Sequence, residues 1–279
     1  AVGAASSKRA ILFPIGPRPS NSMSRLISVI VPCRNEAAHI GGFLDRLLAQ
    51  QLPENTSMEV LIADGMSTDG TRAAIDSYSQ RHPLIQHFPN PAGFVSAGLN
   101  EAIRRAQGDI VLRMDVHTEY ARDYIRECLA VLEETAAQNV GGPTQTAAHG
   151  YFQNISKIVY HAKIGTGGAR FHDVNYEGPV DTVSYGCWRR QTLLDLGGFD
   201  ENLIRNQDDE LNLRLTRAGG KIWQSRRINS WFHPRSSLKR LFRQYLEYGY
   251  WKPYVIKKHK LPSSVRQLIP PLFALTITL

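Results

Sequence analysis

The chain has 279 residues, of which 42% are hydrophobic and 21% are charged, and its formal net charge is +8. This composition excludes a largely disordered protein and suits one large domain or a domain with an extension. The three cysteines are far apart and form no Cys-x-x-Cys, which argues against a disulfide or zinc framework and favours a reducing compartment.

The first half of the chain predicts alternating strands and helices. Residues 1–22 are small and polar, and we expect a flexible leader or residues foreign to the natural chain, outside the fold. Apolar runs predict strands, and helical spacing of apolar residues predicts helices between them. The strands are expected at 27–32, 58–63, 84–88 and 108–115, and the helices at 40–48, from near 69, and at about 91–106. This order indicates an α/β fold with a mostly parallel sheet.

The second half is less regular. We expect a helix with its apolar face at 125–132, strands at 139–142 and 181–185, and helices at 189–196 and 208–218. The last helix has a plausible C-cap at Gly219-Gly220. With the first half, these elements predict one compact domain over 23–234.

Residues 235–279 predict basic helices at a membrane interface. From Arg226 to Arg266, eleven Lys or Arg stand against one acid, Glu247, which is a net +10 in a chain of +8. Such local charge, mixed with aromatic residues at 244–252, suits an anionic membrane surface better than nucleic acid, so no nucleic-acid partner is expected. Packing of these aromatics on the domain is the alternative, and both can hold. We interpret the apolar end, 268–279, as the start of a membrane segment rather than a core helix, although a span needs about 20 residues.

Polar residues follow the predicted strands. The stretches 32–36, 64–71 and 115–117 each begin where a strand stops, and loops at the carboxyl ends of parallel strands converge on one cleft. Neither Gly-x-Gly-x-x-Gly nor Gly-x-x-x-x-Gly-Lys-Ser/Thr occurs, which argues against a dinucleotide dehydrogenase. Carboxylates at Glu36 and Asp64 can still accept hydrogen bonds from a nucleotide base or ribose.

Asp115 and His117 pair a carboxylate with an imidazole at a strand exit. If the strand direction persists, residues two apart point the same way and can hold one divalent cation that carries a phosphate group. The alternative is an Asp that caps a turn beside a surface His.

Taken together, several motifs resemble those of family 2 glycosyltransferases. They are Val31-Pro-Cys-Arg-Asn-Glu36, Asp64-Gly-Met-Ser-Thr-Asp-Gly-Thr71, Asn90 to Asn100, Asp115-Val-His117, and Gly197-Gly-Phe-Asp200 followed by Gln207-Asp-Asp-Glu-Leu211. The resemblance covers about 27–235 and implies a GT-A fold and an inverting mechanism. Within the family, the chain is most similar to bacterial enzymes of the succinoglycan type that elongate lipid-linked oligosaccharides in exopolysaccharide assembly.

The resemblance also implies a donor site for a UDP-sugar. It places Pro32, Arg34 and Glu36 at the border of the nucleotide, and Asp64 on the uracil. Asn100 matches a helix that faces the donor, although an exposed helical Asn is the alternative. Asp115 would bridge the ribose or sugar and the metal region.

The implied metal site departs from the family pattern. His117 stands where the second carboxylate of Asp-x-Asp is usual, and imidazole is a better ligand for Mn²⁺ than for Mg²⁺, so Mn²⁺ is the expected cofactor. His233 resembles the downstream His that completes this site in several members, and a structural His among aromatics is the alternative.

Inversion requires a base that takes the proton of the acceptor hydroxyl. The resemblance aligns Asp208 with this base and Gln207 with the usual preceding Glu, and a shift of one residue would select Asp209 instead. The other interpretation is that these acids are favoured by the helix dipole alone. Arg170 and Arg235 are candidates for contact with the diphosphate or the acceptor.

We therefore expect an inverting transferase that moves a sugar from a UDP-sugar to a lipid-linked, polyprenyl-diphosphate type of glycan. The expected location is the cytoplasmic face of a bacterial inner membrane. Two alternatives are a nucleotidyltransferase, which would carry a Gly-rich basic loop after the first strand, and a non-catalytic protein that binds anionic surfaces or nucleic acid.

Overall fold

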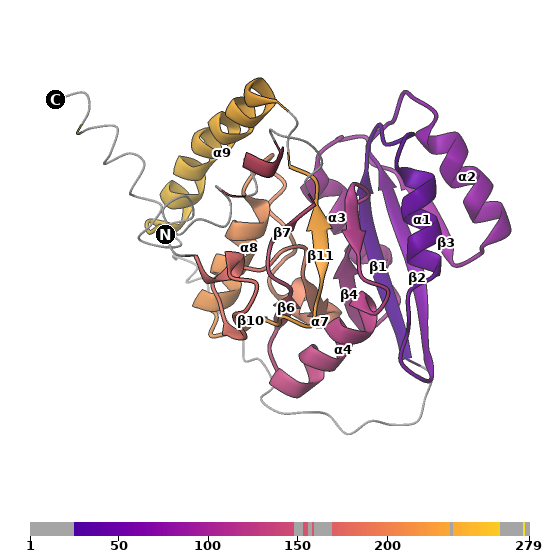
Figure 1. Ribbon diagram of the computed structural model, residues 1–279, viewed down its shortest axis with the longest axis horizontal. Helices are drawn as coiled ribbons and strands as arrows, with labels where there is room; N and C mark the ends of the chain where they lie inside the picture. The colour runs from indigo at the N-terminus through magenta and orange to yellow at the C-terminus, as the bar shows by residue number, and fades with distance from the viewer. Residues whose placement is uncertain are drawn as a thin grey trace, which may run out of the picture.

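The computed structural model describes residues 25–147, 153–155, 158, 169–234, 237–262 and 276 (Figure 1). The predicted leader at 1–22 lies outside the described residues. So do Arg235 and, except for Thr276, the apolar end at 268–279.

Parallel strands from the first half form one side of the larger sheet. The strands are β1 (Arg25–Cys33), β2 (Thr56–Asp64), β3 (Ile85–Pro89) and β4 (Ile110–Arg113), in the spatial order β3-β2-β1-β4. The connecting helices are α1 (Ile40–Leu48), α2 (Thr71–Arg81) and α3 (Val95–Arg105). All three strand pairs are parallel, so the carboxyl ends of these four strands meet at one edge of the sheet.

The sheet continues through shorter strands from the second half. These are β6 (Asn139–Gly141), β8 (Gly178–Pro179), β9 (Cys187–Arg189) and β10 (Ile222–Gln224), which extend the order beyond β4 as β9-β6-β10-β8. The strand β9 runs antiparallel to both of its neighbours, and β8 runs antiparallel to β10. The mostly parallel α/β sheet expected from the sequence is therefore confirmed.

Helices cover both faces of this sheet because the strands are apolar on both sides. On one face, Ile27, Val29 and Val31 of β1 belong to a buried cluster with α1, α2 and α4 (Tyr124–Thr135). On the other face, Ile30 belongs to a cluster with α3, α7 (Arg190–Asp195) and α8 (Gln207–Arg217). Alternate residues of one strand thus serve opposite cores.

A small second sheet lies beside the carboxyl end of β4. It contains β5 (Thr118–Tyr120), β7 (Gln145–Thr146) and β11 (Ser230–Phe232), in the order β5-β11-β7. Thr118 pairs with Phe232 in the antiparallel ladder of β5 and β11. A short 3-10 helix, η1 (Arg170–His172), precedes β8.

Three predicted elements differ from the structure. The strand expected at 181–185 is absent, because Tyr185 (φ 62°) and Gly186 (φ 94°) turn the backbone out of the extended conformation and the strand forms after them, at β9. The helix α2 begins at Thr71 rather than near Asp69, whose carboxylate accepts from the Thr71 and Ala37 N–H groups. The helix α3 begins at Val95 rather than near residue 91, after a turn in which Gly93 has φ 69°.

The helix α9 (Leu238–His259) is attached to the domain mainly through polar contacts. In Figure 1 it lies beside α8, at the end of the molecule away from α1 and α2. Val255 is the residue of α9 that is fully buried. The polar contacts of α9 are ion pairs between Glu247 and Arg205, between Lys252 and Asp209, between Lys258 and both Asp200 and Glu210, and between His259 and Glu210.

The described part of the chain contains no helix with the length and apolar character needed to cross a bilayer. The three cysteines, Cys33, Cys128 and Cys187, are unpaired and buried, with at most 4% of each residue exposed. Burial, followed by the nearby acids Glu36, Asp64 and Asp69, raises the pKa of Cys33 to about 12.

Candidate active site

The loops after β1 and β2 are bound to each other at the carboxyl edge of the sheet. Cys33 and Asp64 are partners in the parallel register, and the Gly65 N–H donates to the Cys33 carbonyl at 2.7 Å. The Asn35 side chain accepts from the Thr68 N–H at 2.9 Å. The Glu36 N–H in turn donates to the Thr71 hydroxyl at 2.8 Å. The two motifs therefore form one surface, as the strand order predicts.

Asp64 is held as a carboxylate within this surface. It is 1% exposed, and Arg72 donates to its Oδ2 from Nε at 3.1 Å and from Nη2 at 2.7 Å, while the Ser67 N–H donates to Oδ1 at 3.1 Å. Burial raises the pKa of Asp64, but the hydrogen bonds from Ser67 and Arg72 outweigh it, so the net shift is downward. The carboxylate is thus charged and fixed in direction.

The other predicted nucleotide residues of this edge lie around Asp64. Pro32 is half-buried within β1, and Arg34 is exposed with its Nη1 3.4 Å from the Gly93 carbonyl oxygen. The Glu36 carboxylate is 21% exposed and lies 3.5 Å from Nδ1 of His117. The structure therefore brings the strand-one and strand-four motifs together.

A buried arginine joins the fourth strand to α8. Arg113, at the end of β4, is 5% exposed and donates from Nε and Nη2 to the two carboxylate oxygens of Asp115, at 2.8 and 3.0 Å. Its Nη1 donates to Oδ1 of Asp208 at 2.6 Å. Asp115, which is predicted on the donor side, and Asp208, the predicted base, are therefore bound by one guanidinium.

Asp208 lies in the first turn of α8, where the helix dipole favours an acid. Its side chain is 41% exposed, so it is accessible as well as bound to Arg113. Loss of hydration raises its pKa first; Arg113 lowers it, and the Asp115 and Asp209 carboxylates raise it further. The net shift is upward, which makes Asp208 a stronger proton acceptor than an ordinary aspartate.

Asp209, the rival base, faces a different partner. Lys252 of α9 forms an ion pair with its Oδ2. The two adjacent acids therefore point to different elements, Asp208 to the sheet and Asp209 to α9.

The predicted metal ligands do not gather into a metal site. β4 ends at Arg113, and a turn closed by the Thr118 N–H on the Asp115 carbonyl (3.2 Å) replaces the extended step to His117. His233 follows β11 at the same end of the ladder, but its Nε2 lies 3.0 Å from Glu119 Oε1. Within the described ranges, no three His, Cys, Asp or Glu side chains form a group that could hold a metal. In this arrangement Arg113 donates to both carboxylate oxygens of Asp115, and the metal role of Asp115, His117 and His233 stays a prediction.

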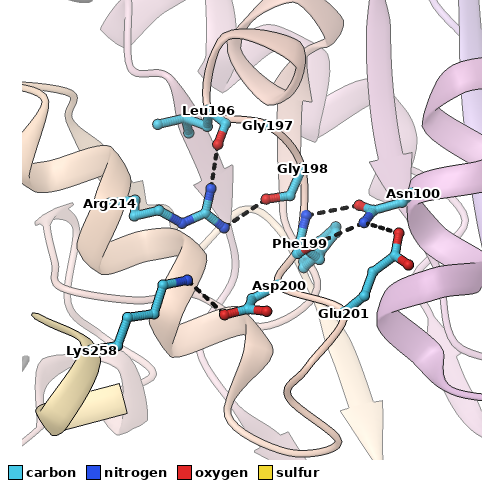
Figure 2. A pocket seen from close by; sticks show the side chains of 9 residues that line it. All are labelled: Asn100, Leu196, Gly197, Gly198, Phe199, Asp200, Glu201, Arg214 and Lys258. Carbon is cyan, nitrogen blue, oxygen red and sulfur yellow. Dashed lines mark hydrogen bonds and ion pairs between the residues drawn. The ribbon is translucent and has the colours of Figure 1, made fainter. Parts of the chain in front are cut away.

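Asn100 joins α3 to the loop that precedes α8 (Figure 2). Its Oδ1 accepts from the Phe199 N–H at 2.8 Å, and its Nδ2 donates to the Phe199 carbonyl at 2.9 Å and to Glu201 at 2.8 Å. With Arg214 and Lys258 it lines a cavity of about 460 Å³ beside Gly197-Gly198. The Asn100 amide thus holds the loop, and its contact with a donor stays a prediction.

Arg170 lies in η1, where its Nη1 donates to the Tyr176 hydroxyl at 3.0 Å and its guanidinium lies over the Tyr176 ring at 5.1 Å. Arg235 lies outside the described residues. The role of either arginine on the diphosphate or the acceptor stays a prediction.

Sequence reasoning missed Arg113 and Arg72. A signal for Arg113 was available, since it interrupts an apolar strand two residues before Asp115, and a buried charge has to be paired. Arg72 is the second residue of α2, and no local pattern indicates that its side chain reaches back to Asp64.

Comparison with known proteins decides the family. Residues 28–194, more than half of the chain, match the family described as Glycosyl transferase family 2. The chain belongs to glycosyl transferase family 2. It is an enzyme, a glycosyltransferase, and this membership overrules the nucleotidyltransferase and the non-catalytic alternatives.

Two curated relatives in this family align over most of the chain. The succinoglycan biosynthesis protein ExoA of Rhizobium meliloti (strain 1021) is 31% identical over 244 residues, which cover 87% of this chain and 73% of that protein. A dolichyl N-acetyl-alpha-D-glucosaminyl phosphate 3-beta-D-2,3-diacetamido-2,3-dideoxy-beta-D-glucuronosyltransferase of Methanococcus voltae is 29% identical over 240 residues, covering 83% of this chain and 74% of that protein.

Solved structures show the same fold. S. aureus TarS 1-349 in complex with UDP has a TM-score of 0.57 at 18% identity, covering 75% of this chain, which spans 60% of that chain. The mannosyltransferase PcManGT from Pyrobaculum calidifontis, in complex with GDP-Man and Mn²⁺, has a TM-score of 0.63 at 20% identity, covering 89% of this chain and 67% of that one. The family 2 chain therefore has the GT-A fold that the motifs implied.

Proposed function

We propose that this glycosyltransferase moves a sugar, with inversion, from a UDP-sugar to a hydroxyl group of a lipid-linked glycan in exopolysaccharide or other cell-surface polysaccharide synthesis. The observation that carries the proposal is the bridge of Arg113 between Asp115 and Asp208. It supports a site in which Asp115 acts on the donor side and Asp208 is the base. ExoA is a succinoglycan biosynthesis protein, and the Methanococcus voltae relative is a transferase named for a dolichyl N-acetyl-alpha-D-glucosaminyl phosphate; these two relatives support a lipid-linked or polysaccharide acceptor, and the UDP complex of TarS supports the donor. A polyprenyl diphosphate is the carrier we propose.

In the proposed reaction, the acceptor oxygen attacks the anomeric carbon from the face opposite the diphosphate. A carbon–oxygen bond to the acceptor forms, the bond to the diphosphate breaks, and its electron pair leaves with UDP. Asp208 takes the proton of the acceptor hydroxyl. Contact of Pro32, Arg34, Glu36 and Asp64 with the nucleotide remains part of this proposal.

A divalent metal, Mn²⁺ rather than Mg²⁺, is the cofactor we propose, although no three His, Cys, Asp or Glu side chains of the described residues are grouped around a common point. The support is chemical: Asp115 and His117 offer a carboxylate and an imidazole, and the structural neighbour PcManGT is complexed with Mn²⁺. In a test by electron paramagnetic resonance, His117→Ala is expected to weaken Mn²⁺ binding, with His87→Ala as the control because His87 pairs with Asp76 instead. Equal binding by His117→Ala and the wild type would remove His117 from the ligands.

The base assignment is tested by replacing Asp208. Asp208→Asn removes the proton acceptor and is expected to lower kcat by at least about 10²-fold with a UDP-sugar and a lipid-linked acceptor. Asp209→Asn is the matched control, because Asp209 is bound by Lys252, and it should lower kcat far less. Protection of each variant by UDP against thermal unfolding verifies that the donor site is intact. Wild-type kcat in Asp208→Asn would exclude this base.

We also propose that α9 rests on an anionic membrane surface, at the cytoplasmic face of a bacterial inner membrane. The side of the helix turned away from α8 is apolar and aromatic, with exposed cations along it. The large exposed residues of this side are Leu238, Phe242, Tyr245, Leu246, Tyr250 and Tyr254, with Leu261 just beyond the helix; Tyr248 of α9 is also exposed, at 38%. The cations are Lys239, Arg240, Lys257 and Lys260. At a membrane surface the aromatic and aliphatic side chains would lie at the depth of the lipid headgroups, and the cations would contact the lipid phosphates.

A further inference from the structure

Arg113 stands out as a charged side chain that the sequence motifs do not assign to the reaction. It is 5% exposed and lies in a strand otherwise composed of Ile110, Val111 and Leu112, all fully buried. Burial lowers the pKa of its guanidinium, but Asp115 and Asp208 outweigh that effect and the net shift is upward. Arg113 therefore stays cationic between two carboxylates.

The backbone of Arg113 is fixed within the larger sheet. Arg113 pairs with Ile30 in the parallel register of β1 and β4, and its N–H donates to the Gly186 carbonyl at 3.2 Å. Its three side-chain contacts have defined directions, two to Asp115 and one to Asp208. A planar guanidinium holds such partners at fixed spacing, because its N–H groups form a rigid fork.

The two carboxylates come from separate parts of the chain. Asp115 follows β4, whereas Asp208 lies 93 positions later in α8, after a helix cap at Asn206 with a left-handed φ of 62°. On its other side, the start of α8 is bound by α9 through Asp209 and Lys252. The position of Asp208 relative to the sheet thus depends on a contact that spans two elements.

We propose that Arg113 is a positioning residue, which fixes the spacing between Asp115 on the donor side and Asp208 on the acceptor side. This inference rests on the proposed function, since it takes Asp208 as the base. By holding both, Arg113 sets where the acceptor hydroxyl stands relative to the anomeric carbon. Displacement of a reacting group by about 1 Å costs on the order of 10²-fold in rate.

The test is Arg113→Lys, which keeps the positive charge but loses the fork. An ammonium cannot make all three directed contacts, so kcat is expected to fall by about 10- to 100-fold while the donor KM changes by less than about threefold. The matched control is Arg190→Lys, since Arg190 is the first residue of α7, directly after the neighbouring strand β9, and donates to the Ile103 carbonyl at 3.2 Å. Arg190→Lys should keep the wild-type kcat. Thermal unfolding gives the folded fraction used to correct each rate.

A double-mutant cycle separates positioning from general support of the fold. If Arg113 acts through Asp208, adding Arg113→Lys to Asp208→Asn causes no further loss of kcat. A loss in the double variant equal to that of Arg113→Lys alone overturns the proposal, and so does a wild-type kcat in Arg113→Lys. The proposed function has its own test: if Asp208→Asn keeps the wild-type kcat, Asp208 is not the base, whatever the result for Arg113→Lys. An inactive Asp208→Asn beside a fully active Arg113→Lys removes the positioning role alone.

Discussion

At the scale of single residues, the neighbours Asp208 and Asp209 show how one turn of helix presents two acids to different partners. Arg113 of the sheet binds the first, and Lys252 of α9 binds the second. Because Asp208 remains 41% exposed, it can meet an acceptor hydroxyl while Arg113 holds it. The structure thus supports the first of the two alignments that the sequence left open.

The raised pKa of Asp208 predicts where activity is lost in acid. Loss of hydration raises this pKa above the ordinary 3.8, Arg113 opposes the shift, and Asp115 and Asp209 add to it. A protonated carboxyl cannot accept the proton, so activity is present above this pKa and declines as the pH falls through it. The dependence of kcat/KM on pH, which reports the free enzyme, should show an acid limb above 3.8. An acid limb at or below that value contradicts the assignment.

Asn100 gives a second prediction at this scale. Asn100→Ala removes an amide that binds both backbone groups of Phe199. Leaving those groups unpaired is expected to cost about 1–3 kcal/mol of the free energy of unfolding, measured by urea denaturation. Asn202→Ala on the exposed part of the same loop is the control and should cost far less. Unchanged stability together with a raised KM for the UDP-sugar would instead favour the donor contact.

Site residues could be located from the sequence where they directly follow an apolar run that forms a strand. Asp64 and Asp115 were placed at the carboxyl edge because apolar runs of the sequence end just before them. In the structure Asp64 is the last residue of β2, and Asp115 follows the end of β4 by two residues. The same reasoning failed for the step to His117, because a turn closed by Thr118 cannot be seen in the alternation of residues. For Arg113, the contact with Asp115 was open to local reasoning, whereas the contact with Asp208 depends on long-range packing. Arg72 was missed because no local pattern shows that its side chain, at the start of α2, reaches Asp64.

At the scale of elements, α9 is held by charges rather than by an apolar face. Lys258 and His259 both reach the Glu210 carboxylate, which is fully buried and also bound by Arg214. The sequence predicted a basic helix with either a membrane or a packing role. In the structure the paired residues of α9 reach α8 and the loop before it, whereas Phe242, Tyr245, Tyr250 and Tyr254 are exposed. One face therefore packs on the domain, and a membrane role of the other stays a prediction.

Glu210 makes the attachment of α9 sensitive to pH. Burial raises the pKa of Glu210, but Arg214, Lys258 and His259 outweigh it, so the net shift is downward from 4.5. The resulting stability is present above 4.5 and is lost as the pH falls through the lowered pKa. Glu210→Gln is expected to lower the free energy of unfolding by about 3 kcal/mol near neutral pH, and the difference from wild type should shrink in acid. Urea denaturation at several pH values measures the difference in the free energy of unfolding between Glu210→Gln and wild type. A difference that stays constant with pH would contradict a lowered pKa of Glu210.

The elements also show the limit of sequence patterns. The first four strands were located to within a few residues. Strands of a parallel sheet are buried on both faces, so continuous apolar runs that alternate with helices predict them well. In the second half, strands of two or three residues carry little periodicity. Val183 is buried, but the strand expected at 181–185 does not form, because the backbone turns at Tyr185 and Gly186, which have positive φ.

At the scale of the whole molecule, the charge is concentrated at one end. The stretch that contains α9 carries eleven Lys or Arg against one acid, so the remaining chain is close to neutral. Figure 1 shows this helix at the end of the molecule away from α1 and α2. If the exposed face of α9 rests on a bilayer, the neighbouring start of α8 and Asp208 lie near the surface from which a lipid-linked acceptor would arrive.

Binding to vesicles tests this orientation. The protein is expected to sediment with phosphatidylglycerol-containing vesicles and to be released by salt, because each basic residue near an anionic surface contributes about 1 kcal/mol and is screened. The double variant Phe242→Ala/Leu246→Ala should lower the partition coefficient at least about tenfold, since these side chains are 71% and 61% exposed. Leu194→Ala, on α7, is the control. Equal binding by the double variant, or equal binding to purely zwitterionic vesicles, contradicts the proposed surface.

The burial of all three cysteines has a practical consequence for such work. None exposes more than 4% of its surface, and the Cys33 thiol is kept protonated near neutral pH. The native protein should therefore resist maleimide reagents while it is folded, with no need to remove its own thiols. A single cysteine introduced at Tyr250 would then carry the only reactive label, and the emission of an environment-sensitive dye there would report directly whether α9 enters the lipid headgroups.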